Sequence, residues 1–226
     1  YEDLVRTNKA RTCLEPEYEL IDTGVFDGDR YVDVFVEYAK ASPEDVLIRI
    51  TVTNRSTEPS VLYVLPHLWF RNTWWQRSGG PVPELRLAPD GEDGPVIVAD
   101  HSELGRRYLH YAPPTNVLFT NNETNIERLF GMSNPNPYVK DGINNFVVHG
   151  RHDAVNPERI GTKSALVYRL AIAPGVSRVV RLRLNEEAAG KDFLGPAFER
   201  VFAERLREAN EFYAKIIPHS AGLDKS

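Results

Sequence analysis

Apolar and polar positions alternate along two neighbouring segments near the start of the chain. Residues 31–40 read YVDVFVEYAK and residues 46–54 read VLIRITVTN. A period of two with many β-branched residues is typical of β-strands. The intervening ASPED supplies turn chemistry. We therefore expect an antiparallel meander of two strands joined by a short loop. One face of the two strands carries Val32, Val34, Val36, Tyr38, Val46, Ile48, Ile50 and Val52.

The next segment, Ser60 to Phe70, is apolar on both of its faces. A strand without a polar face is usually buried on both sides. Trp69 is therefore expected in the core, and His67, on the same face, is expected to be a hydrogen-bonded core histidine. Pro66 has no N–H to donate to a neighbouring strand, which predicts either a bulge or a sheet edge at this position.

Shorter apolar runs predict the remaining strands, and a less regular segment separates them. These strands are expected at 96–100, 106–112, 117–121, 163–172 and 177–184. The last two flank Pro174-Gly175, and this turn predicts a hairpin that closes the sheet system. Residues 121–161 are rich in Asn, Pro and Gly and follow no period. A segment of this length is typical of a functional loop or a docking surface, and an ordinary surface loop is the alternative.

The hydrophobic period changes near the end of the chain. From Pro196 to Ile217 the apolar residues are spaced by three and four, which predicts an amphipathic helix of ~30 Å. Proline suits the first turn of a helix. A β-rich chain that ends in one long helix favours a further domain beyond it. We therefore expect part of the apolar stripe to be exposed. The stripe includes Phe198, Phe202, Leu206 and Tyr213.

Composition narrows the class of protein. The 226 residues carry a net charge of −5 with mixed signs, so nothing resembles the basic stripe that binds nucleic acid. Cys13 is the single cysteine, which excludes an intrachain disulfide framework. No apolar run approaches the ~20 residues of a membrane-spanning helix, and no secretion signal opens the sequence. We expect a cytoplasmic protein. Because the first residue is Tyr1 rather than methionine, the chain is expected to be a piece of a longer protein.

Several long stretches resemble one protein family. They are residues 15–56, LPHLWFRNTWW at 65–75, LFTNNETNIERLFG at 118–131, PYVKDGINNFVVHG at 137–150, and FAERLREANEFYAKIIP at 202–218. Together they resemble large microbial glucosidase-like proteins related to glycoside hydrolase family 63, the mannosyl-oligosaccharide glucosidase relatives. The resemblance covers essentially the whole chain.

The resemblance implies a fold and a division of labour. The family plan is an all-β antiparallel supersandwich, of the galactose-mutarotase-like type found at glycosidase N-termini, followed by an (α/α)6 barrel. The expected organisation is a supersandwich at 1–195, a linker helix at 196–218 leading to the barrel, and a tail at 219–226. The barrel carries the catalytic carboxylic acids. No motif in this chain matches them, so no catalytic residue, cofactor or metal is expected here, and the partner is the chain's own barrel.

Two clusters of chemically active residues favour structural roles. Asp33 and Glu37 share a strand face, but their Cα atoms are expected ~13 Å apart, too far for the paired carboxyls of a glycosidase. We expect them to pair with arginines or to lie on a polar face. His149 and His152 have the spacing of zinc ligands on a helix. Gly150 and the valines before it disfavour a helix there, and no third ligand is placed.

The segment after Trp69 holds the candidate binding residues. Trp74 and Trp75 are adjacent, so on extended chain they point to opposite faces, and at least one is directed towards the surface. Arg71 and Asn72 add hydrogen-bond donors beside them. Three interpretations remain open: packing within the domain, contact with the missing barrel, and stacking on an oligosaccharide.

Three functions are therefore weighed. The first is a non-catalytic domain that supports the barrel, with or without a loop at the rim of its active site, in an enzyme that hydrolyses α-linked glucosides or mannosides. The second is a free-standing carbohydrate-binding module. The third is a mutarotase-like sandwich enzyme, which requires a histidine and a carboxylate to converge on one concave face. Activity assays of this chain beside the full-length protein separate them.

Overall fold

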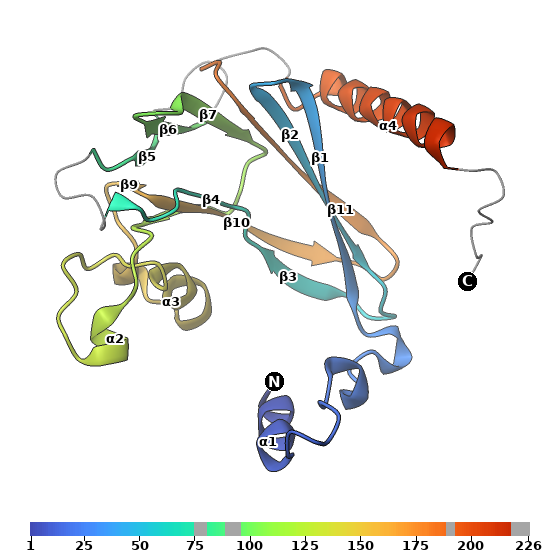
Figure 1. The fold of residues 1–226 in the computed structure, drawn as a ribbon, viewed down its shortest axis with the longest axis vertical. Coiled ribbons are helices and arrows are strands. Elements are labelled where there is room, and N and C mark those ends of the chain that lie inside the picture. Colours follow the sequence, from blue (N-terminus) through green and yellow to red (C-terminus); the bar gives the residue numbers. More distant parts are fainter. Residues whose placement is uncertain (75–80, 89–95, 189–192, 218–226) are drawn as a thin grey trace.

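Two antiparallel β-sheets lie face to face in the computed structural model of the protein, and a long helix packs on the outer side of the larger sheet (Figure 1). The structure describes residues 1–74, 81–88, 96–188 and 193–217. Every strand pairing within these ranges is antiparallel. The predicted β-sandwich class with a C-terminal helix is therefore confirmed.

The larger sheet has seven strands among the described residues, in the order β1-β2-β11-β7-β6-β5-β9. They are β1 (Val32–Ser42), β2 (Asp45–Asn54), β5 (Glu84–Leu87), β6 (Val96–His101), β7 (Gly105–Tyr111), β9 (Ile160–Gly161) and β11 (Ser177–Asn185). The predicted meander is confirmed, because β1 and β2 pair in one register from Val32 opposite Asn54 to Lys40 opposite Val46. Within the described chain β1 pairs with β2 alone, so β1 forms a free edge.

The smaller sheet is built around β10 (Lys163–Ile172). β8 (Asn116–Thr120) pairs with one side of β10, and β3 (Ser60–Val64) and β4 (His67–Trp69) pair with the other. β3 and β4 pair with β10 in the same register, since Tyr168 lies opposite Val64 and Ala165 lies opposite His67. β3 and β4 therefore form one strand interrupted at Pro66 without a bulge, which we call the β3–β4 strand. In the described structure its other side is unpaired, which confirms the predicted edge.

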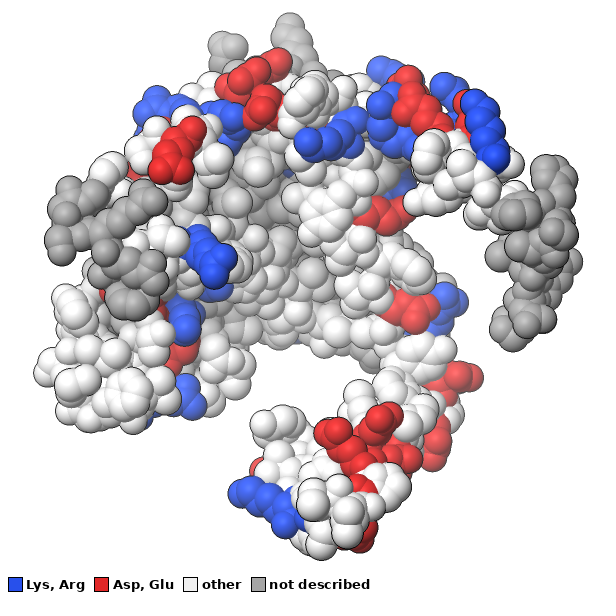
Figure 2. All heavy atoms as spheres, viewed as in Figure 1, with Lys and Arg blue, Asp and Glu red and all other residues white. Residues whose placement is uncertain are grey.

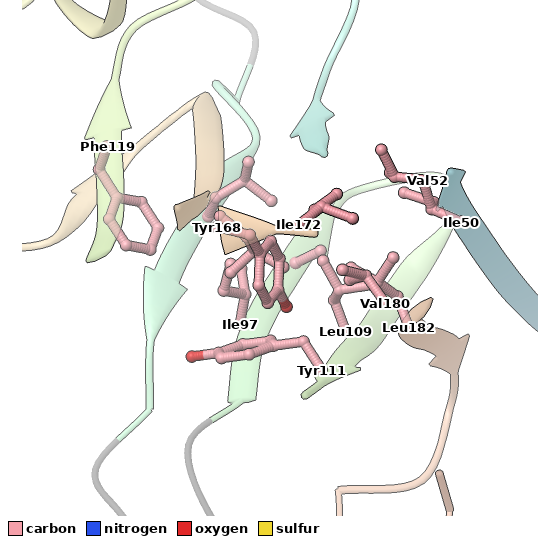
Figure 3. Packing of buried hydrophobic residues seen from close by; sticks show 13 residues of the cluster. Ile50, Val52, Ile97, Leu109, Tyr111, Phe119, Tyr168, Ile172, Val180 and Leu182 are labelled. Atoms are coloured by element: carbon pink, nitrogen blue, oxygen red, sulfur yellow. The ribbon is translucent and has the colours of Figure 1, made fainter. Parts of the chain in front are cut away.

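The main core lies between the two sheets (Figure 3). Alternation along β10 directs Leu166, Tyr168 and Ile172 into it. The larger sheet contributes Ile50, Val52, Leu85, Ile97, Ala99, Leu109, Tyr111, Val180 and Leu182. Burial of each large apolar side chain stabilises the fold by ~1.5–3 kcal/mol. Tyr168 satisfies its hydroxyl by donating to the carbonyl of Ala112 at 2.6 Å.

The predicted hairpin between β10 and β11 is wrong, although both strands are where the periodicity places them. β10 pairs within the smaller sheet and β11 pairs with β2 and β7 in the larger one. The turn at Pro174-Gly175 therefore carries the chain from one sheet to the other. Asn54 fixes this crossing, because its backbone bonds both Gly175 and Val176 and its side chain donates to the carbonyl of Ile172.

Helix α4 (Pro196–Ile216) covers the outer face of β1 and β2, as far as its first two turns. Phe198 and Phe202 are buried against Ala39 and Leu47. The rest of the helix extends past the sheet (Figure 1). Its later apolar side chains are exposed, among them Leu206 at 62%, Phe212 at 59% and Tyr213 at 54%. The predicted helix and the partial exposure of its stripe are both confirmed.

The irregular middle of the chain folds against the outer face of the smaller sheet. It contains the helices α2 (Ile126–Phe130) and α3 (Gly142–His149) and the 3₁₀ turn η4 (His152–Ala154). Ile143 of α3 packs with Leu118 of β8 and with Ala165 and Val167 of β10. This cover reaches Leu65 of the β3–β4 strand but leaves Val61 and Tyr63 of the same strand 53% and 50% exposed.

The first thirty residues form a segment that projects from the sheets (Figure 2). It consists of α1 (Glu2–Ala10) and the 3₁₀ turns η1 (Leu20–Thr23) and η2 (Asp27–Asp29), none of which contains a buried residue. Reciprocal hydrogen bonds between Asn8 and the backbone of Tyr18 fold it on itself. No helix within the described ranges has the length and apolarity to span a membrane.

Candidate functional site

The candidate residues Arg71, Asn72 and Trp74 continue from the end of β4. Two asparagines fasten this segment to the end of β8. Asn72 Nδ2 donates to the carbonyl of Asn122 at 3.2 Å, and Asn122 Nδ2 donates to the carbonyl of Phe70 at 2.9 Å. Asn72 Oδ1 is buried and accepts no hydrogen bond in the structure as described. Two side-chain amides therefore attach the segment to the start of the irregular middle of the chain.

Trp74 is partly buried against that middle segment. Its indole Nε1 lies 3.5 Å from Oε1 of Glu123, at the long limit of a hydrogen bond. Trp75 lies outside the described residues. For Trp74 the structure supports packing within the domain, with one side of the ring left at the surface.

Trp69 is 50% exposed, so its predicted place in the core is wrong. It lies on the outer face of the smaller sheet, opposite Lys163 of β10. α3 covers only the part of that face nearer β8. The β3–β4 strand is therefore buried on its core face but only partly covered on its outer face, although both faces are apolar. The ammonium of Lys163 lies 5.8 Å from the centre of the Trp69 ring, within the range of a cation–π interaction.

A hollow of about 510 Å³ opens beside Trp69. One wall is the candidate segment and the other is the turn between β6 and β7. Its lining residues are Trp69, Phe70, Arg71, Thr73, Trp74, Pro81, Pro83, His101, Ser102, Glu103 and Leu104. Arg71 is exposed and makes no ion pair or hydrogen bond in the described structure. An aromatic ring with free donors around it matches the C–H faces and hydroxyls of a sugar.

His101 organises the far wall of this hollow. Its Nδ1 accepts hydrogen bonds from the backbone N–H groups of Glu103 and Leu104 at 3.1 and 3.2 Å, and its ring packs on Phe70 with centroids 5.3 Å apart. With Nδ1 accepting, the neutral ring carries its proton on Nε2. His101 and Glu103 both line the hollow, and the Nδ1 lone pair of His101 is already engaged by the backbone.

His67 does not belong to the core as predicted. Its side chain keeps an exposed edge and makes no hydrogen bond among the described residues. Surrounding protein still displaces enough water to lower the pKa of His67 to about 4, and repulsion from Lys163 adds to this. The pKa of Lys163 is itself lowered, first by burial and then by Lys140. At neutral pH His67 is uncharged beside an ammonium that has no carboxylate partner in the described chain.

The acid pair on β1 is structural, as predicted. Glu37 accepts two hydrogen bonds from Arg49, at 2.8 and 2.9 Å, and Arg49 also bonds Glu199 of α4. Hydrogen bonding to Arg49 lowers the pKa of Glu37. Asp33 pairs with Arg55. Both carboxylates are therefore occupied by arginines rather than poised around a scissile bond.

The HxxH pair is split by a helix end. α3 continues to His149, so the expectation that no helix forms there is wrong, and Gly150 ends it in a left-handed conformation with φ of 65°. His152 lies in η4 and packs edge-on against Phe146. Across the described ranges no three His, Cys, Asp or Glu side chains group as metal ligands.

One apolar groove has no counterpart in the sequence predictions. A groove of about 320 Å³ opens between the free edge of β1 and the β3–β4 strand, and its lining is almost entirely apolar. The signal was present in the alternation of Val34, Val36 and Tyr38, which the structure leaves 52%, 48% and 69% exposed.

No family model matches this chain. It is similar to a yeast protein. The chain is 32% identical over 258 residues to Uncharacterized protein YMR196W of Saccharomyces cerevisiae. The match takes in 96% of this chain but 24% of the yeast protein. The chain therefore spans about a quarter of the length of this relative.

Proposed function

We propose that residues 1–226 form a non-catalytic β-sandwich domain, of the supersandwich type, in a larger glycoside hydrolase related to family 63. Its role is to brace a catalytic (α/α)6 barrel and to contribute to the rim of the active site. The observation that carries this proposal is the unfinished packing of α4.

The apolar stripe of α4 is continuous, but only its beginning is covered. Phe198 and Phe202 are buried by the larger sheet, whereas Leu206 and Tyr213 further along are more than half exposed. A hollow of about 660 Å³ between α4 and β1 connects the stripe to the exposed Tyr38. The hollow also holds the charged side chains of Glu37, Arg49 and Glu199. Exposed apolar residues beside charged ones are typical of a surface that docks another domain.

Two further observations favour a domain that braces a catalytic barrel rather than one that carries catalytic residues. Glycoside hydrolysis by either common mechanism uses two carboxyl groups ~5–9.5 Å apart, and the acids first considered for this, Asp33 and Glu37, are each held by an arginine. The yeast relative is about four times as long as its match to this chain, which leaves room for a barrel of the kind that the family resemblance implies.

The decisive experiment compares the full-length gene product with residues 1–226 on α-linked gluco- and manno-oligosaccharides. We expect hydrolysis with inversion by the full-length protein and none by the 226-residue chain. Turnover by the shorter chain alone, or inertness of the full-length protein on all such substrates, would overturn the proposal.

Carbohydrate binding by the domain itself is a second candidate, favoured by the hollow beside Trp69. The Trp69 ring is half-exposed, and Arg71 and Thr73, which both carry hydrogen-bond donors, line the same hollow. Calorimetry with gluco- and manno-oligosaccharides tests this on the 226-residue chain. The absence of heat at millimolar ligand would exclude it and leave the supporting role intact.

A further inference from the structure

Along its outer edge the β3–β4 strand presents a row of backbone hydrogen-bonding groups that have no partner among the described residues. On the edge that faces β10, Leu166 N donates to the carbonyl of Pro66 at 3.0 Å, and Phe70 N donates to the carbonyl of Thr162 at 3.0 Å. In an antiparallel pair, alternate residues direct their backbone groups towards the partner. The even-numbered residues from 60 to 70 therefore face β10. The odd-numbered ones face away from it, namely Val61, Tyr63, Leu65, His67 and Trp69.

None of the described residues blocks pairing along this edge. Proteins usually protect an edge strand with a proline whose missing N–H faces outwards, with charged side chains, or with a cover. Pro66 is even-numbered, so its missing donor falls on the β10 side and the outer row is intact. Residues 60–69 contain no Asp, Glu, Lys or Arg, and His67 is neutral at pH 7 because its pKa is about 4.

The groove next to this edge is shaped for the side chains of one more strand. Leu65, Pro66 and His67 line one side of it, and Val34 and Val36 of β1 line the other. Its floor is the inner face of the larger sheet, through Ile48, Ile50, Leu109, Leu182 and Leu184. Because two edge strands bound the same groove of about 320 Å³, it admits a single extended chain and not a second sheet.

The two sheets are unequal in width on this side. Seven strands of the larger sheet face three rows in the smaller one. Neighbouring strands lie ~4.8 Å apart, so the smaller sheet ends before it covers the inner face of β1. One strand added outside β3–β4 would extend the smaller sheet over Val34 and Val36 and would cover their exposed surface.

We infer that the β3–β4 edge receives an added β-strand from the same polypeptide, from a part of it outside residues 1–226. The strand carries apolar side chains at alternate positions, which fill the groove, while its backbone pairs with Val61 to Trp69. Two observations favour this source. The yeast relative is about four times as long as its match to this chain, and an edge this apolar and unguarded suits a permanently attached partner rather than a transient one. The inference is independent of whether the longer protein hydrolyses glycosides.

Residue-resolved hydrogen exchange of the full-length gene product tests this within a single strand. Outward-facing amides of Val61, Tyr63 and Trp69 are expected to exchange slowly, as slowly as the inward-facing amides of Leu62 and Val64. In the 226-residue chain the inward amides are expected to exchange slowly. The outward amides are expected to exchange at least a hundredfold faster than they do in the full-length protein. Equal and fast exchange of the outward amides in the full-length protein would overturn the inference.

A proline substitution gives the matched control. Tyr63→Pro removes one outward donor and leaves the ladder to β10 intact, so in the full-length protein it should accelerate exchange at the neighbouring outward amides alone. Leu62→Pro removes an inward donor and should accelerate both sets. Slow outward amides in the 226-residue chain itself, whether as a monomer or as a concentration-dependent dimer, would show that its own residues or a second copy occupy the edge, and would also overturn the inference.

Discussion

Asn54 at the end of β2 donates a hydrogen bond from Nδ2 to the carbonyl of Ile172 at the end of β10, at 3.1 Å. The two residues belong to different sheets, and the Asn54 side chain is fully buried. The same Nδ2 donates to the carbonyl of Glu58, and Oδ1 accepts from the backbone N–H of Ser56. One amide therefore holds together the end of β2, the loop that follows it and the crossing between the sheets.

Replacement of Asn54 by alanine should lower the free energy of unfolding by ~2–4 kcal/mol, because the buried carbonyl of Ile172 and two partly buried backbone groups lose their partner at once. Urea unfolding followed by circular dichroism measures the change. Arg178→Ala, on the exposed side of the neighbouring β11, serves as the control and should change it by less than ~0.5 kcal/mol. A loss for Asn54→Ala no larger than the control would show that the crossing is fixed by other contacts.

Arg49 links β2, β1 and α4. Its guanidinium bonds Glu37 and Glu199 and lies 4.3 Å from the centre of the Phe202 ring. Arg49→Met keeps the aliphatic stem but removes these bonds, so α4 should loosen from the sheet, and hydrogen exchange in its first two turns should accelerate several-fold. The exposed pair Arg207–Glu211 provides the comparison, since Arg207→Met should leave that exchange unchanged.

The stability of the sandwich should depend on His67 at acid pH. The pKa of His67 is lowered from 6.5 to about 4 in the fold, so between these values the unfolded chain takes up the proton more readily. The free energy of unfolding therefore falls as pH falls from about 6.5 to about 4, and this contribution is lost only in that window. His67→Gln should flatten the decline relative to the wild type in urea unfolding at pH 7.5, 6, 5 and 4.5. His149→Gln, on α3, should leave the wild-type slope in place.

Oligosaccharide binding, if the hollow beside Trp69 is a sugar site, should depend on that ring. Trp69→Ala should weaken binding about tenfold or more, corresponding to ~1.4 kcal/mol. Tyr63 is equally exposed on the same strand but lies outside the hollow, so Tyr63→Ala should leave affinity unchanged. Titration calorimetry on the 226-residue chain gives both values, and equal losses in the two variants would argue against a specific site.

The exposed end of α4 should matter only in the longer protein. Leu206→Ser with Tyr213→Ser replaces two exposed apolar side chains, so the 226-residue chain should keep its melting temperature within a degree or two. In the full-length protein the same pair should lower it by several degrees, because the docked surface is lost. Arg207→Ser, on another face of α4, should be neutral in both. An unchanged full-length protein would mean that the stripe faces solvent there too.

Local periodicity predicted the strands of this fold better than it predicted their partners. The alternation in β1, β2, β10 and β11 located each strand within about two residues. It could not show that the Pro174-Gly175 turn connects two sheets, because a sheet-to-sheet turn and a hairpin turn use the same residues. The decisive contact, from Asn54 to Ile172, joins positions more than a hundred residues apart.

The sequence predicted only one wall of the candidate site, the segment that follows β4. Arg71, Asn72 and Trp74 were chosen because they follow a tryptophan-rich strand, and the structure brings Arg71 and Trp74 together in one hollow with Trp69. Asn72 instead fastens the segment to Asn122. The opposite wall, formed by the turn after β6, has no sequence signal that relates it to them. The sequence predicted burial of Trp69 and His67 because both faces of their strand are apolar. In the structure the outer face of this strand stays largely exposed around them.

The contact between α4 and β1 imposes an order on biosynthesis. Phe198 packs against Ala39 across about 160 residues of sequence. A ribosome adds ~5–20 residues per second, so the first strand waits roughly ten seconds or more for its covering helix to be made. During that interval the nascent amino-terminal half has apolar strands without their final neighbours, and exposed apolar strands of this kind are prone to aggregate.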